Sequence, residues 1–354
     1  EAAAEEMLSI TIKDMVTKKY YSWTTREFDT PDNLELNVSW TEQEMLTNFI
    51  TWWAENTPDI LTGWNVNLYD VPYIARRVNR ILGEKWMKSL SPWNRANERE
   101  VYVQGRRNYA YDISGVNILD YLDLYRKFTY SSQESYRLDH IAFVELGQRK
   151  VNHDEYENFK DFYTSDWQKF MEYNIQDVEL IDRLEDKMKL LELAITMSYD
   201  AKANFEDVYS QVRMWDTMIY NYLTDRQVVV PPRKGAKKDE KYAGAYVKEP
   251  IPGKYRKDIH GFLPEMMQKI YDERTIYKKK MLAAKQQHEI TPSNKLVADI
   301  SKFNNIQMAR KIQLNSAYGA IGNQYFRYYN LANAEAITLS GQVSIRWIEN
   351  KMNE

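Results

Sequence analysis

Two aspartates and a tyrosine have the chemistry of a metal-dependent phosphodiesterase site. Asp70 follows a segment with strand character, and Asp177 lies in a long segment with helical character. Tyr173 precedes Asp177 by four residues, so both side chains are expected on one face of that helix. Two-metal hydrolysis needs convergent carboxylates that hold two cations about 4 Å apart, and a polar group that orients the attacking water. A single aspartate after a strand is more often a helix cap or a surface group, so these residues alone are a weak indication.

A second set of residues, in the C-terminal half, has the spacing of a phosphate clamp. Arg274 and Lys278 are one turn apart on one helical segment. Lys311, Asn315 and Tyr318 fall on one stripe of a second helical segment, which is expected to end near Gly319. Two facing helices with three cations could bind a triphosphate. The asparagine and the tyrosine, further along the same stripe, could contact the sugar and the base. The alternative is that this basic face is only solvated.

Alternating strands and helices are expected to position the first set. Residues 8–12 and 19–23 have the alternation and the β-branched or aromatic content of strands. Residues 60–65 are expected to form a strand that ends in a turn, and residues 116–124 are a further strand candidate. Helical spacing of apolar residues predicts helices over residues 42–56, 72–82 and 165–193. The opening Glu/Ala run is also prone to form a helix. This order predicts an α/β domain over about the first 190 residues.

The second set is expected to lie on a pair of helices. Residues 264–282 and 301–314 have helical spacing, and the polar sequence between them contains Pro292 and Ser293. A basic loop, residues 231–238, separates this half from the α/β domain, and residues 242–247 begin a new element. The sequence therefore predicts an α/β part followed by an α part.

Composition excludes some kinds of site and locates the positive charge. The chain has 354 residues, no cysteine and four histidines without metal-ligand spacing, which excludes disulfides and thiolate-bound zinc. No stretch approaches the roughly 18 apolar residues of a membrane span. Residues 233–327 hold 20 lysines and arginines against 9 acidic residues, although the whole chain has a net charge of −3. A basic half that binds phosphates is one explanation. Ordinary variation of surface charge is the other.

Several motifs, in order along the chain, resemble those of the family B DNA polymerases. Residues 311–319, KIQLNSAYG, resemble the family's motif B, K-x-x-x-N-S-x-Y-G, and the following AIGN and FRYY are similar to polymerases of T-even-type bacteriophages. Residues 62–73, TGWNVNLYDVPY, resemble the second exonuclease motif, and residues 173–177, YNIQD, the third. Residues 242–245, YAGA, resemble the motif between exonuclease and polymerase domains. Residues 118–125 and 135–138 also fit the exonuclease domain.

The resemblance implies a fold and a domain order. The fold is α/β plus α: a ribonuclease-H-like 3′→5′ exonuclease domain, a remnant of the palm, and antiparallel helical fingers. The expected domains are residues 1–190 (exonuclease), 191–232 (connecting helical segment), 233–256 (start of the palm), 257–323 (fingers) and 324–354 (return into the palm).

It also implies an activity and roles for the residues above. The parent activity is DNA-directed DNA synthesis with 3′→5′ proofreading in phage replication, in the cytoplasm of an infected bacterial host. Asp70 and Asp177 would bind Mg²⁺ or Mn²⁺, and Tyr173 would position the hydrolytic water. The expected DNA contacts are Tyr242, Gly244 and Asn65. Partners would be primer-template DNA and dNTPs, with a sliding clamp and other replisome proteins reached through regions absent here.

In the fingers, three cations would neutralise the triphosphate of the incoming nucleotide: Arg274, Lys278 and Lys311. Asn315 and Tyr318 would line the nucleotide pocket. Gly319 would permit close approach to the nascent base pair.

The sequence also departs from the family pattern. The first exonuclease motif, Asp-x-Glu, is expected before residue 1, motif A between Arg256 and Lys257, and motif C beyond Glu354. Asp112, Asp120 and Asp123 could replace the missing exonuclease carboxylates, but Asp120 and Asp123 are expected to face opposite sides of a strand. We therefore expect this chain to be an inactive partial form, either shortened by an internal deletion or joined from separate segments. The alternatives are a non-catalytic DNA-binding piece of a split polymerase and a stand-alone exonuclease, which would have no use for motif B.

Overall fold

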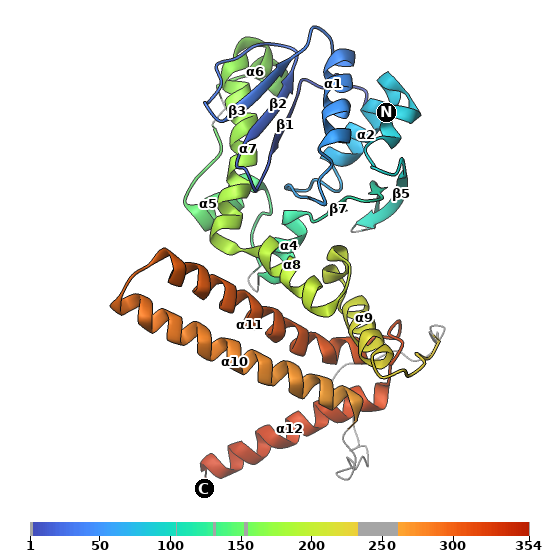
Figure 1. Ribbon diagram of the computed structural model, residues 1–354, viewed down its shortest axis with the longest axis vertical. Helices are drawn as coiled ribbons and strands as arrows, with labels where there is room; N and C mark the ends of the chain where they lie inside the picture. The colour runs from blue at the N-terminus through green and yellow to red at the C-terminus, as the bar shows by residue number, and fades with distance from the viewer. Residues whose placement is uncertain (1–2, 104, 130–131, 152–154, 233–260, 354) are drawn as a thin grey trace. The chain divides into compact units, whose positions relative to one another are not determined.

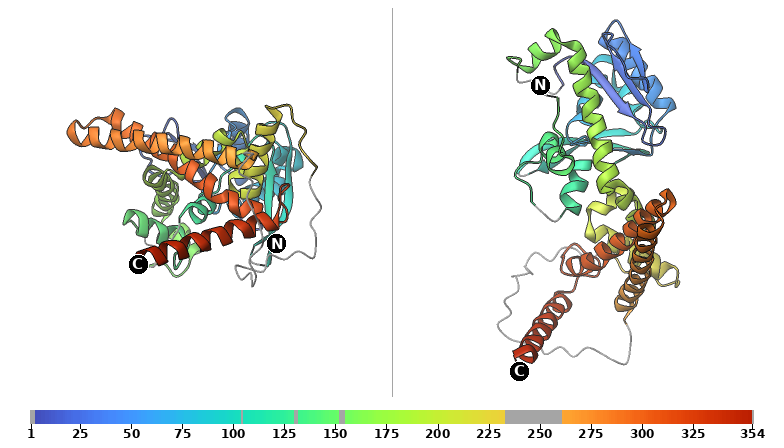
Figure 2. Two further views of the ribbon diagram at one scale, coloured as in Figure 1. Left: turned by 90° about the horizontal axis from the view of Figure 1, so that it is seen from below. Right: turned by 90° about the vertical axis from the view of Figure 1, so that its left-hand side faces the viewer.

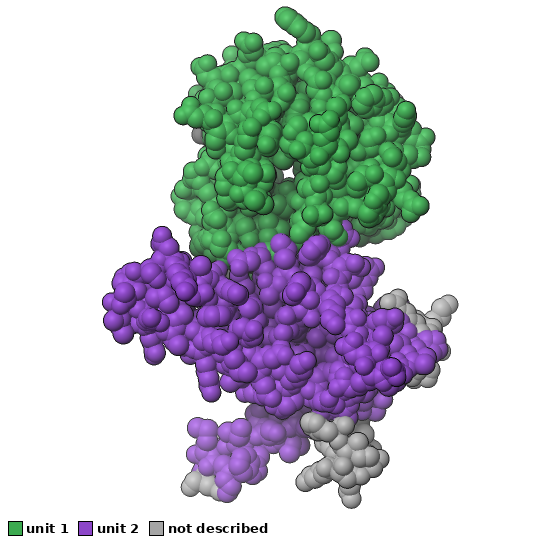
Figure 3. Space-filling model, in the orientation of Figure 1, with its two compact units in different colours: residues 1–191 green, residues 192–354 purple. Residues whose placement is uncertain are grey.

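The computed structural model describes residues 3–103, 105–129, 132–151, 155–232 and 261–353. The chain forms two compact units, Glu1–Leu191 (unit 1) and Glu192–Glu354 (unit 2), which Figure 3 shows in two colours. Each unit has its own hydrophobic core. Unit 1 is mixed α/β, and unit 2 is helical over its described residues.

The strands of unit 1 form three small sheets. The first contains β1 (Ser9–Lys13), β2 (Tyr20–Thr24) and β3 (Leu34–Val38), with β1 antiparallel and β3 parallel to β2. The second pairs β4 (Ile60–Leu61) with β7 (Asn117–Ile118) in parallel, and the third is the hairpin of β5 (Ala96–Val103) and β6 (Arg106–Ile113). Among the described strands, β1 and β4 are each the end strand of their sheet.

Helices cover these sheets. They are α1 (Glu42–Glu55), α2 (Asp70–Leu82), α3 (Glu84–Lys88), α4 (Tyr121–Phe128), α5 (Leu138–Leu146), α6 (Phe159–Ser165) and α7 (Trp167–Met188). The first sheet lies between α1, which packs on β2 and β3, and α7, which packs on β1 (Figure 1). The face of α1 that carries Phe49 and Trp53 is buried, and Phe49 packs edge-on against Trp23 of β2 at 5.1 Å between ring centroids. The helix expected over residues 42–56 is therefore confirmed as α1.

Unit 2 is built around a helical hairpin. It contains η1 (Phe205–Tyr209), α9 (Gln211–Thr224), α10 (Phe262–Ile290), α11 (Asn294–Ile321) and α12 (Leu331–Asn353), and α8 (Leu190–Ala201) leads into it. The helices α10 and α11 pack along each other (Figures 1 and 2). The side chain of Ser293 caps α11 by accepting a hydrogen bond from the N–H of Leu296 at 3.3 Å. The buried indole of Trp215 in α9 donates hydrogen bonds to the carbonyl of Gln313 and to Ser316 Oγ in α11.

Three of the secondary-structure elements expected from the sequence are wrong. The strand expected over residues 116–124 is limited to β7, because Asp120 caps a helix, α4, that begins at Tyr121. The helix expected over residues 165–193 is interrupted at Lys189, which is left-handed with φ of 56° and separates α7 from α8. The described residues of the opening Glu/Ala run, from Ala3 onward, are not helical. The guanidinium of Arg77 instead binds the carbonyls of Ala3 and Ala4.

Candidate active site

A tight loop places Asp70 at the first position of α2. Asn65 is left-handed with φ of 62°, and its carbonyl accepts hydrogen bonds from the N–H groups of Leu68 and Tyr69 at 3.2 and 3.0 Å. The N–H of Val71 donates to the carbonyl of Val66 at 3.0 Å. The loop therefore leads directly into α2. The helix dipole at this terminus favours an ionised carboxylate.

One face of α7 carries Tyr173, Asn174 and Asp177. Tyr173 and Asp177 are one turn apart, and Lys150, from the segment after α5, reaches both of them. Lys150 Nζ donates to Asp177 Oδ2 at 2.6 Å and to Tyr173 Oη at 3.2 Å. A cation thus links the predicted metal ligand to the predicted water-positioning residue.

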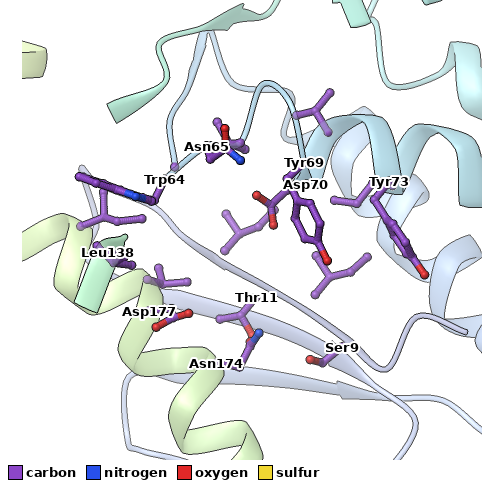
Figure 4. A pocket seen from close by; sticks show the side chains of 18 of the residues that line it. Ser9, Thr11, Trp64, Asn65, Tyr69, Asp70, Tyr73, Leu138, Asn174 and Asp177 are labelled. Carbon is purple, nitrogen blue, oxygen red and sulfur yellow. The ribbon is translucent and has the colours of Figure 1, made fainter. Parts of the chain in front are cut away.

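Asp70 and Asp177, far apart in the sequence, line the same cavity of unit 1. Its volume is about 1800 Å³, and Lys150, Tyr173 and Asn65 also line it. In Figure 4 the two carboxylates project into this cavity from different walls, Asp70 from the start of α2 and Asp177 from α7. The structure therefore brings together the four unit 1 residues that the sequence predicted.

The two carboxylates interact electrostatically. The residue Asp70 is exposed, yet burial of its carboxylate by the surrounding protein raises the pKa of Asp70 to about 6. The negative charge of Asp177 raises the pKa of Asp70 as well, and the positive charge of Lys150 lowers it. Burial alone would lower the pKa of Lys150, but Asp177 and Tyr173 outweigh it and hold that pKa above its ordinary value. The cavity therefore concentrates negative charge that a cation compensates.

The oxygen atoms around this cavity fit a hard divalent cation in part. Carboxylate and amide oxygens are the ligands that Mg²⁺ and Mn²⁺ prefer. Beside the two carboxylates, Asn174 Oδ1 is buried and accepts no hydrogen bond from the part of the chain that the structure describes. Those same residues contain no group of three or more His, Cys, Asp or Glu side chains that could hold a metal ion. Asp70 and Asp177 thus supply only part of the donor set that a two-metal site needs.

The aspartates considered as replacements do not complete the site, since none of them lines the cavity. Asp112 accepts a hydrogen bond from Arg99 at 2.7 Å within the β5–β6 hairpin. Asp120 is buried and caps α4, and Asp123 lies on the exposed side of the same helix. The expectation that Asp120 and Asp123 face opposite sides of a strand is wrong, because Asp120 is the N-cap of α4 and Asp123 lies in the first turn of that helix.

Lys150 is the residue of this site that the sequence did not indicate. It follows Arg149 in a polar segment without periodicity, and basic pairs of this kind are usually solvated. Its role depends on α5 packing against α7, which brings residues 27 positions apart into contact. The only local sign is the glycine that ends α5, Gly147, whose φ of 69° turns the chain back toward α7.

The predicted nucleotide-binding cations of α10 are partly accessible. Lys278 is exposed and Arg274 is half-buried. The buried Nε of Arg274 has no hydrogen-bond partner among the described residues. A guanidinium with an unused buried donor suits an anionic ligand.

The other predicted residues lie on α11. Asn315, Tyr318 and Gly319 are exposed and Lys311 is half-buried, whereas the opposite face, with Ser316 and Ala317, is buried. Tyr318 Oη and Thr338 Oγ1 of α12 share a hydrogen bond at 2.7 Å. A Cβ added at Gly319 would lie 2.6 Å from Gln211 Oε1 of α9, so this glycine closely approaches a flexible side chain.

The three predicted DNA contacts have different outcomes. Tyr242 and Gly244 lie outside the described residues. Asn65 lines the cavity of unit 1, and its backbone holds the loop before Asp70.

Two family models match the chain. Residues 1–141 match "DNA polymerase family B, exonuclease domain", and residues 257–354 match "DNA polymerase family B". No described helix is both long and apolar enough to cross a membrane.

Curated relatives agree with this match. The chain is 29% identical to the DNA-directed DNA polymerase of Escherichia phage RB69 and 30% identical to that of Enterobacteria phage T4. Both alignments cover 88% of the chain, but only 45% and 46% of the relatives. A DNA polymerase of Thermococcus gorgonarius is 24% identical over 99% of the chain and 49% of its own length. The chain thus spans about half the length of the relatives it matches. Matches to two models of one family, in the same order as its exonuclease and polymerase motifs, place this chain among the family B DNA polymerases.

Proposed function

We propose that unit 1 is the 3′→5′ proofreading exonuclease of a phage-type replicative DNA polymerase. The observation that carries the proposal is the convergence of Asp70, Asp177, Tyr173 and Lys150 on one cavity. A divalent cation bound by Asp70 and Asp177 would neutralise the scissile phosphate and lower the pKa of the attacking water. Tyr173 would orient that water through its hydroxyl. Lys150 would hold Tyr173 and Asp177 in place.

The remaining carboxylates, on this proposal, come from a strand that carries the family's first exonuclease motif. The cavity is lined by β1 residues, including Ser9 and Thr11, and by Leu61 of β4. Because β1 and β4 are the end strands of their sheets among the described elements, a strand added along either edge would bring its side chains toward Asp70 and Asp177.

Unit 2, we further propose, contains the fingers that bind the incoming dNTP. Arg274, Lys278 and Lys311 would neutralise the triphosphate, with Asn315 and Tyr318 beside the sugar and base. The unused buried donor of Arg274 supports this role. Binding of primer-template DNA by the basic residues 233–327 should weaken strongly as the salt concentration rises, because the release of counterions from the DNA phosphates drives this binding. Affinity that stays constant over a severalfold change in salt would contradict this part of the proposal.

A second candidate is a non-catalytic DNA-binding piece of a split polymerase. Two observations favour it for the chain as written. Glu5, Glu6, Asp139 and Asp182 also line the cavity, but no three acidic side chains among the described residues are grouped so that they could hold a metal ion. The alignments with the phage polymerases also extend over 413 residues, more than the 354 of the chain, so these relatives contain internal residues without a counterpart here.

Binding of Mn²⁺, followed by electron paramagnetic resonance, tests the exonuclease site without requiring turnover. We expect one class of bound Mn²⁺ that is lost in Asp70→Asn and in Asp177→Asn, because each change removes a charged ligand. Asp112→Asn is the matched control, since Asp112 lies outside the cavity, and it should bind as the unchanged chain does. Equal Mn²⁺ binding in all four proteins would refute the assignment of Asp70 and Asp177 as ligands.

A further inference from the structure

The carboxylate of Asp120 is buried beneath the loop that leads to Asp70. Its residue is only 3% exposed, and its oxygens accept backbone N–H groups from two separate segments. Oδ1 accepts from Asn65 and from Leu122, and Oδ2 accepts from Asn67, each at 3.0 Å. The bond to Leu122 caps α4, whereas the bonds to Asn65 and Asn67 reach across to the loop before α2. Capping of α4 uses only Oδ1, so the hydrogen bond from Asn67 to Oδ2 serves a different purpose.

Two further hydrogen bonds join the same segments. Thr62 Oγ1 donates to the carbonyl of Leu119 at 2.7 Å, and the N–H of Tyr121 donates to the carbonyl of Gly63 at 2.9 Å. Together with the bonds of Asp120, these hydrogen bonds join residues 62–67 to residues 119–122. After residue 67 the loop continues to Asp70, the first residue of α2.

The loop has little freedom once these bonds are made. Asn65 has a left-handed backbone, a conformation that few residues other than glycine adopt and that asparagine tolerates better than most. Its N–H and that of Asn67 converge on one carboxylate. An ionised carboxylate can accept on both oxygens, while an asparagine amide accepts on one and donates on the other.

We propose that Asp120 is a positioning residue of the exonuclease site, whose carboxylate holds the backbone of Asn65 and Asn67 so that the Asn65 side chain and Asp70 face the cavity. The inference rests on the proposed exonuclease function of unit 1. Asp120 itself does not line the cavity and therefore acts through the loop.

Two substitutions separate this role from helix capping. In Asp120→Asn, Oδ1 still caps α4, because asparagine is among the preferred N-cap residues. Its NH₂ group then faces the N–H of Asn67, so two donors meet. In Asp120→Ser the hydroxyl also caps a helix, and the second acceptor is lost without a new donor. Asp123→Asn, which makes the same chemical change on the exposed side of α4, is the matched control.

The experiment measures binding of a short 5′-fluorescein-labelled oligothymidylate by the full chain in Ca²⁺, with fluorescence anisotropy as the readout. We expect Asp120→Asn and Asp120→Ser to weaken binding about fivefold to tenfold, the effect of roughly one lost hydrogen bond. Asp123→Asn should leave binding unchanged. Asn65→Ala should weaken it similarly, and the double variant Asp120→Asn/Asn65→Ala should lose less affinity than the product of the two single effects, because Asp120 acts in part through the Asn65 side chain.

Each outcome decides one question. If Asn65→Ala has no effect, the cavity does not bind the strand and the proposed function fails, whatever Asp120 does. If Asn65→Ala weakens binding but both Asp120 variants bind as Asp123→Asn does, the positioning role is wrong. Full additivity of Asp120→Asn and Asn65→Ala would also overturn it, because a general loss of stability would act independently of Asn65. If Asp120→Asn does not fold, the same comparisons are made with Asp120→Ser.

Discussion

At the scale of single residues, the cavity of unit 1 is organised by charge. Asp70 and Asp177 repel each other across it, and Lys150 lies against Asp177 at 2.6 Å. The sequence predicted the two aspartates and the tyrosine because they belong to local motifs. Lys150 could not be predicted in the same way, since its position depends on the packing of α5 on α7.

The pKa of Asp70 should report this arrangement directly. We expect Lys150→Met to raise the pKa of Asp70 above about 6, because Lys150 lowers it in the unchanged protein. Asp177→Asn should lower it, because the charge of Asp177 raises it. Carboxylate carbon chemical shifts of labelled aspartate, followed by NMR through a pH titration, measure both changes. A cation must compete with protons for Asp70, so Mn²⁺ binding by Lys150→Met should move to higher pH.

Lys160→Met is the control for this titration. Lys160 also lines the cavity, but it is not among the groups that shift the pKa of Asp70. Its loss should leave that pKa in place. An Asp70 pKa that is the same in Lys150→Met and in the unchanged protein would show that the lysine does not compensate the site.

At the scale of elements, the sequence predicted helices best where apolar residues recur along one face of the helix. The helices α1, α10 and α11 were expected from apolar spacing, and the structure extends the last two well beyond the expected ends. The error at residues 116–124 has a local cause. The apolar run of β7 continues into α4, and only the capping of α4 by Asp120 marks where strand becomes helix. The β5–β6 hairpin was not predicted, because β5 is largely polar and exposed and shows no apolar alternation.

An ion-pair network joins three helices of unit 2. Arg310 of α11 pairs with Asp200 of α8 and, at 2.7 Å, with Glu273 of α10. Each of these side chains is at most 30% exposed. Arg310 precedes Lys311 and Glu273 precedes Arg274, so the network fixes the register of the two helices that carry the proposed triphosphate clamp.

Removal of this arginine should destabilise unit 2. Arg310→Met leaves two partly buried carboxylates without their cation, and we expect a loss of about 3 kcal/mol in the free energy of unfolding. The loss should be much smaller when Asp200→Asn and Glu273→Gln are already present. Urea denaturation followed by circular dichroism measures these differences. Arg226→Met is the control, because its pair with Glu265 is about half exposed and should contribute less than about 1 kcal/mol. Equal effects of the two arginine substitutions would contradict a structural role for the network.

At the scale of the whole molecule, the proposed function implies parts of two catalytic sites in one chain. On that proposal, unit 1 carries Asp70 and Asp177 as two carboxylates of an exonuclease site, and unit 2 carries cations suited to a triphosphate. The sequence could predict this division because family motifs are local. How the carboxylates converge depends on contacts between residues distant in the sequence, such as those of Asp120 with the loop before α2. Those contacts became visible only in the folded chain.

The chain as written should therefore neither extend nor degrade DNA at a useful rate. Both reactions need several carboxylates around two divalent ions, and no three His, Cys, Asp or Glu side chains among the described residues are grouped to hold a metal ion. Without the other ligands the metal ions are not held in place. The cations of unit 2 alone then face negative charge on the reacting phosphate that the metal ions should stabilise. We expect only background loss and extension of a 5′-labelled primer, annealed to a template, with Mg²⁺ or Mn²⁺ and all four dNTPs. Asp70→Asn and Lys311→Ala should give the same background as the unchanged chain. Robust degradation that disappears in Asp70→Asn, or robust extension that disappears in Lys311→Ala, would show instead that residues outside these motifs complete the corresponding site.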